Sequence, residues 1–215
     1  MDYHRPQRGF DHVFFLCANL RLADGEVTRG KLFTCVRFRY RVEVDLEFIV
    51  RRCGSGDETA LSLLGRATFL ETYAGRSEAA DLLAYAETEH SIESYRLWLA
   101  NEFAHIWAVE TAVGRSAIGY LVALISPNAV SGPEIEIKRL YLLYRFHRNG
   151  LGQLLMNEVL AAARQSRVVK LFLKVQDANQ SAIDFYLHNG FRVVGEEPFR
   201  AGTRDYKVLV MRLAL

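Results

Sequence analysis

The 215-residue sequence lacks the features that mark several protein classes. Its three cysteines, Cys17, Cys35 and Cys53, are odd in number and widely spaced, which excludes a Cys-x-x-Cys site and argues against a disulfide framework. No stretch approaches the roughly 20 consecutive apolar residues that a membrane-spanning helix needs. The short apolar run at residues 13–20 is preceded by acidic residues and makes a poor signal peptide. We therefore predict a cytoplasmic protein in a reducing environment, with no membrane partner.

Motifs for metals and for the common nucleotide loops are missing as well. The six histidines have no metal-ligand spacing, so no metal is expected. A Walker loop is ruled out because Gly152 is followed by Gln153 rather than by lysine. The dinucleotide pattern Gly-x-Gly-x-x-Gly is disfavoured because its last position is Leu155.

The composition is that of a folded domain with an uneven distribution of charge. Half of the residues are hydrophobic and 24% are charged, so the chain can bury a core and fits one large domain. The net charge of +2 conceals a segment at 57–102 with 3 basic and 9 acidic residues, and a segment at 134–215 with 13 basic and 8 acidic residues. This contrast is consistent with one cationic and one anionic ligand, or with helix faces in solvent that simply differ in charge.

Hydrophobic periodicity predicts helices and strands in one α/β layer structure, with a mixed sheet covered by helices. Helices are expected over residues 57–73, 77–86, 91–99, 150–163 and 181–188, with Ser77 and Ser91 as N-caps of the second and third. Strands are expected over residues 36–48, 106–109, 117–125, 135–143, 168–175, 191–195 and 206–213. Arginines alternate with aromatic residues in the first of these strands. This could serve nucleic-acid contacts, but one solvated strand face explains it as well, and we do not expect a nucleic-acid partner.

The most informative stretch is residues 139–155, RLYLLYRFHRNGLGQLL. An apolar strand runs into a basic loop that contains Gly150 and Gly152 and opens an amphipathic helix. Unpaired N–H groups at the helix start, the close approach that glycine permits, and the charges of Arg145 and Arg148 together predict a phosphate or pyrophosphate site. A helix that merely begins with glycines in a loop would give the same pattern.

A second motif lies downstream, in residues 179–191, NQSAIDFYLHNGF. Asn179, Ala182 and Tyr186 fall on one face of a helix, and Gly190 fits its C-terminal cap. Alone, this pattern also describes an asparagine N-cap and a packed tyrosine.

Taken together, the two motifs resemble the GNAT superfamily of acetyl-CoA-dependent N-acetyltransferases. Residues 68–73, 118–121 and 137–141 are also similar, and they resemble the spermidine/spermine (polyamine) acetylating branch. The resemblance implies a GNAT domain at residues 45–215, with a mixed, mostly antiparallel central sheet flanked by helices. Residues 1–44 are left as an N-terminal extension of unclear role.

The resemblance also assigns roles to individual residues. Asn179 would hydrogen-bond the cofactor arm, Tyr186 would lie near the thioester sulfur, and Glu136 would accept the amine proton through water. The arm would lie along Leu140, Tyr141 and Leu142, and the pyrophosphate would be held by His147, Arg148, Asn149, Gly150, Leu151, Gly152 and Gln153. His147 stands where the family usually has arginine or glutamine, so cofactor affinity could depend on pH.

From this resemblance we expect direct transfer of acetyl from acetyl-CoA, as co-substrate, to a primary amine in a ternary complex. The first choice of acceptor is a small cationic amine such as a polyamine, drawn by the acidic segment, with Glu71, Asp81, Glu87 and Glu89 as candidates. Protein N-termini, lysines and aminoglycosides are alternative acceptors. A non-catalytic acyl-CoA sensor and a nucleic-acid-associated protein are alternative functions. Monomer and homodimer both remain open.

Overall fold

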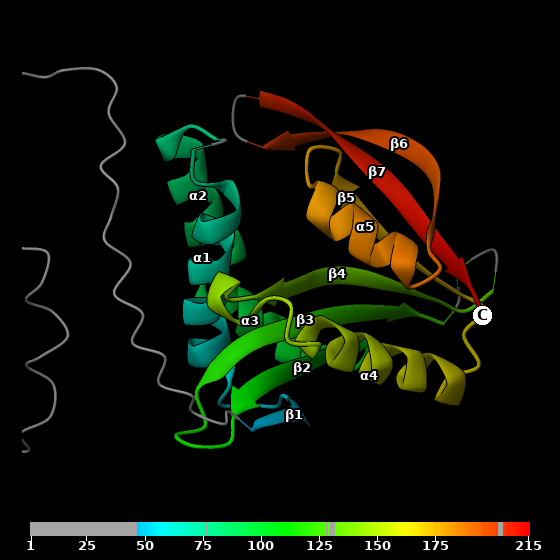
Figure 1. The fold of residues 1–215 in the computed structure, drawn as a ribbon, viewed down its shortest axis with the longest axis horizontal. Helices are drawn as coiled ribbons and strands as arrows, with labels where there is room; N and C mark the ends of the chain where they lie inside the picture. Colours follow the sequence, from blue (N-terminus) through cyan, green and yellow to red (C-terminus); the bar gives the residue numbers. More distant parts are fainter. Residues whose placement is uncertain (1–46, 76, 128, 130–131, 202–203) are drawn as a thin grey trace, which may run out of the picture. The chain divides into compact units, whose positions relative to one another are not determined.

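The computed structural model describes residues 47–75, 77–127, 129, 132–201 and 204–215 (Figure 1). The expected strand at 36–48, apart from its last two residues, lies outside the described residues, as does the arginine pattern within it. The N-terminal extension and its boundary at residue 44 therefore stay predictions.

A seven-stranded sheet with helices on both faces makes up the described part of the chain. The helices are α1 (Glu58–Tyr73), α2 (Ala79–Glu89), α3 (Ile92–Ala100), α4 (Leu151–Gln165) and α5 (Gln180–His188). The strands are β1 (Phe48–Arg52), β2 (Ala104–Thr111), β3 (Ala117–Ser126), β4 (Glu134–Leu142), β5 (Lys170–Gln176), β6 (Arg192–Ala201) and β7 (Arg204–Ala214). Their order is β1-β2-β3-β4-β5-β7-β6, and only the β4–β5 pair is parallel. The predicted mixed, mostly antiparallel sheet flanked by helices is confirmed.

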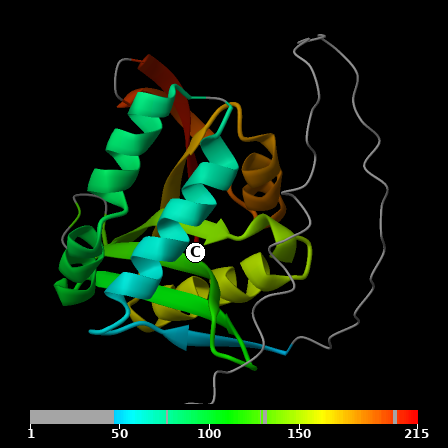
Figure 2. The same ribbon diagram turned by 90° about the vertical axis from the view of Figure 1, so that its left-hand side faces the viewer.

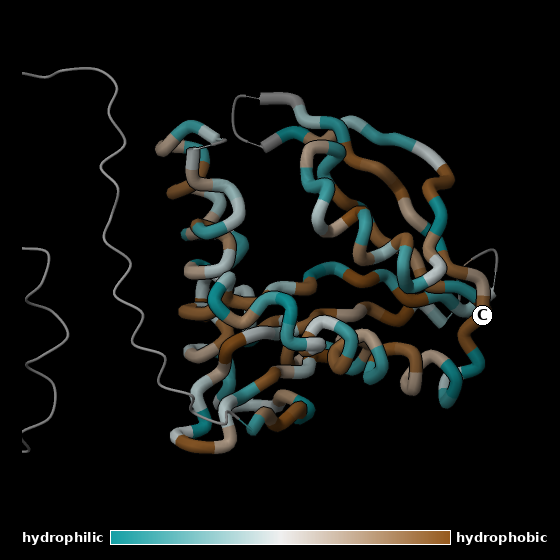
Figure 3. Tube along the Cα trace, viewed as in Figure 1, coloured by the Kyte–Doolittle hydropathy of each residue, from teal (hydrophilic) through white to brown (hydrophobic). Residues whose placement is uncertain are grey.

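Two apolar cores lie on opposite faces of this sheet. On one face, α4 and α5 bury Leu155 and Val159, among others, against the strands. On the other, α1 and α3 bury Leu61 and Tyr95 against β2 and β3. Apolar residues recur along the strands in Figure 3, as expected for a sheet covered on both faces. None of the helices in the described ranges is long and apolar enough to span a membrane.

The helix predictions hold, with one error in capping. Ser91 caps α3 by accepting a hydrogen bond from the Ser94 N–H at 3.0 Å. Ser77 does not cap α2: the N-cap is Glu78, and the Ser77 hydroxyl lies 3.3 Å from the Tyr206 hydroxyl of β7. A serine before a helix can satisfy its hydroxyl through tertiary contact instead of the helix N-terminus, and here the long-range partner prevails.

The strand predictions miss the two ends of the sheet. Residues 48–52 were not predicted to form a separate strand, yet they pair with β2 as β1, and Arg51 bonds both Asp57 and Glu110 at 2.6 Å. β6 reaches Ala201 rather than residue 195. Charged residues and Pro198 occupy that part of the strand, and edge strands tolerate both, so the apolar alternation is hidden.

β4 and β5 pair over four residues only, from Glu134–Lys170 to Ile137–Leu173. Beyond this point β4 continues beside β3 and β5 beside β7, so the two parallel strands diverge (Figure 1). Figure 2 views the molecule from the side where α1 and α2 lie, which is the side toward which the strands diverge. This divergence positions the residues considered next.

Candidate active site

A bulge in β4 reverses the direction of its side chains. Lys138 has no partner in β3, because Val122 pairs with Arg139 and the next residue of β3 pairs with Ile137. Ile137 before the bulge and Leu140 after it consequently both pack on the α4 side. Glu136 and Arg139 therefore both point toward the face covered by α1, α2 and α3.

Beyond the pair Ile137–Leu173, the diverging strands β4 and β5 leave an opening between them, and the end of β4 presents backbone groups to it. The Leu143 N–H donates to the Ile118 carbonyl at 2.9 Å, so the N–H and C=O of Leu142 point away from β3, and those of Leu140 do the same by alternation. The backbone groups of Tyr141 face β3 instead. Among the described residues no β5 residue pairs with Leu140 or Leu142, so this edge can bind an extended ligand as an added strand.

One group on this edge already has a partner. His147 Nε2 donates to the Leu142 carbonyl at 2.9 Å, which fixes the imidazole against the strand instead of directing Nε2 at a phosphate. The imidazole of His147 is exposed, leaving the opposite ring edge in reach of a ligand.

The loop between β4 and α4 has the geometry of an anion site. Arg148 and Gly150 both adopt left-handed backbone angles, with φ of 62° and 74°. The Asn149 side chain donates to the Phe146 and His147 carbonyls at 3.3 Å, and α4 begins at Leu151 without a side-chain cap. Left-handed residues in such a turn direct neighbouring backbone N–H groups outward, where the dipole of α4 adds positive charge. The loop is hydrophilic in Figure 3.

Gly150 and Gly152 serve different purposes in this loop. Gly150 supplies the positive φ, and an added Cβ there would meet nothing within 4 Å. At Gly152 an added Cβ would lie 3.4 Å from the ring of Phe185 in α5, an ordinary packing distance, so this position is where the start of α4 packs against α5.

Tyr186 is buried in α5, against the rings of Phe185 and Phe191 at 5.4 and 5.6 Å. Burial, and secondly the nearby Tyr73 of α1, raise the pKa of Tyr186 well above its usual value. The hydroxyl is thus a hydrogen-bond donor at every physiological pH. Because α1 and α5 cover opposite faces of the sheet, an interaction between their tyrosines requires the opening between β4 and β5.

Asn179 and Glu136 each already have a partner. The Asn179 side-chain oxygen caps α5 by accepting from the Ala182 N–H at 3.3 Å, which leaves its amide nitrogen to donate elsewhere. Glu136 is partly buried, and its Oε1 accepts from Lys138 Nζ at 2.9 Å. This pairing leaves Glu136 Oε2 for other contacts.

A buried polar network that the sequence did not indicate lies on the α1 face. The Tyr95 hydroxyl is 2.9 Å from His90 Nδ1 and 2.7 Å from the Tyr120 hydroxyl. Burial, and secondly the positive charges of Arg139 and Arg66, lower the pKa of His90 to about 3. His90 is therefore neutral at physiological pH.

Arg139 connects this network to the end of α2. Its guanidinium lies 5.4 Å from the ring centre of Tyr95 and donates to Glu89 Oε2 at 3.0 Å. Burial raises the pKa of Tyr141, and the nearby Tyr73, which shares a side-chain hydrogen bond with it, raises this pKa further. These residues come from five separate elements, so no local sequence pattern could have identified them together.

The four acidic residues proposed for the acceptor do not form one group. Glu89 pairs with Arg139, while Glu71 accepts a hydrogen bond from the Tyr144 N–H at 2.9 Å, near the phosphate loop. Asp81 lies in the first turn of α2, and Glu87 is exposed near its end.

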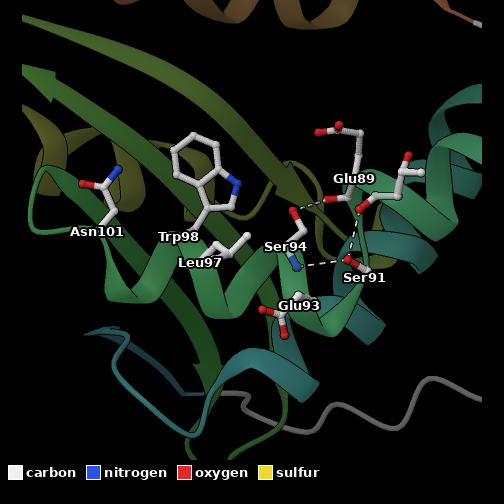
Figure 4. A pocket seen from close by; sticks show the side chains of 8 residues that line it. Glu89, Ser91, Glu93, Ser94, Leu97, Trp98 and Asn101 are labelled. Carbon is white, nitrogen blue, oxygen red and sulfur yellow. Dashed lines mark hydrogen bonds between the residues drawn. The ribbon is translucent and has the colours of Figure 1, made fainter.

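A surface hollow of about 530 Å³ runs along α3 (Figure 4). Glu89 and Trp98 point to one side of it and Glu93 to the other. The Ser91 and Ser94 hydroxyls donate to backbone carbonyls at its rim, at 3.0 and 3.2 Å. None of the residues assigned to the acyl donor lines it.

No group of three or more histidine, cysteine or carboxylate side chains within the described ranges is arranged to hold a metal ion. Cys53 is buried, and burial together with nearby Asp57 raises its thiol pKa to about 12, so it is a poor nucleophile.

Solved structures with the same fold include several acetyltransferases. The PaiA N-acetyltransferase of Thermoplasma acidophilum, in complex with coenzyme A, gives a TM-score of 0.64 at 20% identity over 79% of this chain and 99% of that one. An Arabidopsis thaliana NAA60 structure with acetyl-CoA gives 0.59 at 15% identity, covering 79% and 99%. At these identities the likeness establishes the fold.

Sequence comparison gives the family. Uncharacterised N-acetyltransferases of Mycobacterium tuberculosis and Mycobacterium bovis are 36% identical over 78 residues, which is 36% of this chain and 50% of theirs. The chain thus matches about half the length of these curated relatives. The model of the acetyltransferase (GNAT) family matches residues 72–191, which run from the end of α1 past α5 and include the bulged strand, the loop between β4 and α4, and Tyr186. The chain therefore belongs to the acetyltransferase (GNAT) family.

Proposed function

We propose that this protein transfers an acetyl group from acetyl-CoA to a primary amine, by direct attack in a ternary complex. The observation that carries the proposal is the divergence of β4 from β5, with a left-handed glycine loop opening α4 at one side and the buried Tyr186 at the other. Acetyl-CoA supplies an activated thioester.

Residues of this chain are suited to bind both the pyrophosphate and the extended arm of acetyl-CoA. Outward N–H groups at the start of α4, with Arg145 and Arg148 nearby, favour a pyrophosphate. The backbone groups of Leu140 and the N–H of Leu142, whose carbonyl is already bound by His147, favour the amides of an extended arm. The Leu140 N–H is the natural donor to negative charge that develops on the acetyl oxygen.

The acceptor must lose a proton before it can attack. An alkylamine with a pKa of about 10.4 pays roughly 4.6 kcal/mol to be neutral at pH 7. Glu136 is the proposed base, acting through water, because it lies on the face opposite the phosphate loop and keeps Oε2 outside its ion pair with Lys138. A second carboxylate on that face, Glu89, is committed to the buried Arg139.

Tyr186 is proposed to stabilise the departing thiolate. A thiol has a pKa of about 8.5 and an unperturbed tyrosine about 10, so full proton transfer is already uphill by roughly 2 kcal/mol. Burial raises the pKa of Tyr186 further, which favours donation of a hydrogen bond over transfer of the proton.

For the acceptor we propose a small cationic amine such as a polyamine. Support comes from the acidic segment 57–102, which forms α1, α2 and α3 on the acceptor face. The rings of Tyr73 and Tyr85, which flank Phe69 at 4.8 Å, add surfaces that attract alkylammonium groups.

The test is thiol release from acetyl-CoA across polyamines, aminoglycosides and peptides with free N-termini or lysines. We expect release that requires an amine and is greatest with a polyamine. Tyr186→Phe should lower kcat about 10- to 100-fold at unchanged CoA affinity. Tight CoA binding without amine-dependent release would overturn the enzyme proposal in favour of a sensor, and release only with peptides would overturn the polyamine.

CoA binding is tested separately at Gly150. Alanine at φ 74° is strained by roughly 1–2 kcal/mol, whereas asparagine tolerates this conformation. We expect weaker CoA binding by calorimetry for Gly150→Ala and little change for Gly150→Asn; equal affinities would remove the loop from the proposed site.

A further inference from the structure

Gln176 is the last residue of β5 and borders the opening. Leu173 and Val175 pack into the α4 and α5 core, so by strand alternation the side chain of Gln176 points to the opposite face, where α1 and α2 lie. Its β7 partner, Val208, is buried. Gln176 therefore faces the side from which the acceptor approaches.

The register places Gln176 level with the proposed reaction centre. Ile137 is opposite Leu173, the last β4–β5 pair. Counting three residues on from this pair, with Lys138 bulged out, sets Gln176 across the opening from Tyr141, the residue after Leu140. Leu140 is the residue whose N–H was assigned above to the acetyl oxygen.

Gln176 carries an unused hydrogen-bonding atom. Its side-chain oxygen Oε1 is buried and has no hydrogen-bond partner, although its main-chain carbonyl accepts from the Asn179 N–H at 2.9 Å. Leaving a buried acceptor unpaired destabilises a fold, typically by about 1–3 kcal/mol. Neither the sheet nor the α5 cap uses this oxygen, so the fold gives no reason for it.

We propose that Gln176 Oε1 accepts an N–H of the acceptor amine and so turns the nitrogen lone pair toward the acetyl carbon. This rests on the proposed function. An amide oxygen only accepts hydrogen bonds, and it carries no net charge. A carboxylate there would favour the ammonium form, which cannot attack, whereas a neutral oxygen binds the reactive free amine.

The arrangement selects primary amines. As the C–N bond forms and the C–S bond breaks, one amine proton leaves through water to Glu136 and the thiolate departs. A primary amine keeps a second N–H on Gln176 throughout. A secondary amine has one N–H only, which cannot both stay on Gln176 and be lost.

Gln176→Leu tests this in the full chain, with Gln165→Leu on the exposed end of α4 as the matched control. The acceptors are the most active amine of the panel above and its N-methyl derivative. We expect kcat/KM for the primary amine to fall about 3- to 15-fold, preference over the N-methyl form to shrink, and KM for acetyl-CoA to stay unchanged. Thermal stability should be equal or higher, because an unpaired buried oxygen is removed.

A second variant probes charge. Gln176→Glu should move the acid side of the pH–rate profile upward, because the carboxylate retains the amine in its protonated form. If the wild type acetylates amines and Gln176→Leu has the same kinetics, the role of Gln176 is overturned while the proposed function stands. A raised KM for acetyl-CoA would reassign it to the donor. No amine-dependent release from the wild type would overturn the proposed function and this inference with it.

Discussion

Single residues decide whether the polar network on the α1 face can form. Gly65 lies inside α1, where glycine costs about 1 kcal/mol relative to alanine. A Cβ at this position would lie 2.2 Å from the Tyr95 hydroxyl and 2.5 Å from His90 Nδ1. The weaker helix former is thus required by the close approach of two polar groups, both deeply buried.

We therefore predict that Gly65→Ala lowers the free energy of unfolding by about 1–3 kcal/mol, although alanine favours helix. Denaturant titration measures it. Tyr95→Phe removes the closest atom, so the double variant should recover part of the loss. A Gly65→Ala protein as stable as the wild type would contradict the close approach.

His90 makes stability depend on pH. Its folded pKa of about 3 lies below the ordinary value of 6.5, so the unfolded chain binds a proton that the folded one does not. Stability is complete above pH 6.5 and falls progressively as the pH drops toward 3, by roughly 2 kcal/mol at pH 5. Thermal unfolding between pH 7 and 5 should show a smaller loss for His90→Gln than for the wild type. Parallel curves would contradict a buried neutral imidazole.

At the scale of elements, the two serines before α2 and α3 differ in what they contribute. Ser91→Ala removes the cap of α3 and should cost about 1 kcal/mol. Ser77→Ala removes only a contact with Tyr206 and should cost less. Chemical denaturation of both variants checks this, and equal losses would show that Ser77 has an additional structural role.

Sequence reasoning predicted elements wherever apolar periodicity is local. The helix that became α4 has apolar residues along one side, and its glycine start was correctly located. β1 was not predicted because it is short and contains two arginines. The guanidinium of one of them, Arg51, bonds Glu110, which is distant in the sequence. The bulge at Lys138 was equally invisible, since it depends on pairing with β3.

At the scale of the whole molecule, the charge contrast seen in the sequence separates the helices α1, α2 and α3 from the elements that begin with β4. The acidic segment forms the helices of one face, and the basic segment supplies the loop proposed to bind phosphate and the strands that follow it. What the sequence could not provide is the meeting of distant groups. Tyr73 of α1 influences both Tyr141 of β4 and Tyr186 of α5, and Gln176 at the end of β5 is level with Tyr141, although these residues are far apart in the sequence.

This distribution predicts a salt dependence that reports on the acceptor. Raising ionic strength from about 10 to about 150 mM shortens the screening length from about 30 to about 8 Å. KM for a polyamine should rise several-fold, and KM for a monoamine of equal length should change less. Steady-state kinetics at both salt concentrations checks this, and equal changes would mean that the acidic face does not attract the acceptor.

In the part of the chain that the structure describes, the four residue pairs between β4 and β5 are the sheet pairing that joins a four-stranded half to a three-stranded half. A ligand bound between the diverging edges of β4 and β5 would hydrogen-bond to both strands and stabilise their relative position. Binding of the acyl donor would therefore stabilise the junction of the two sheet halves in addition to supplying the acetyl group. We expect amide deuterium exchange in β5 and β7 to slow when the donor is bound.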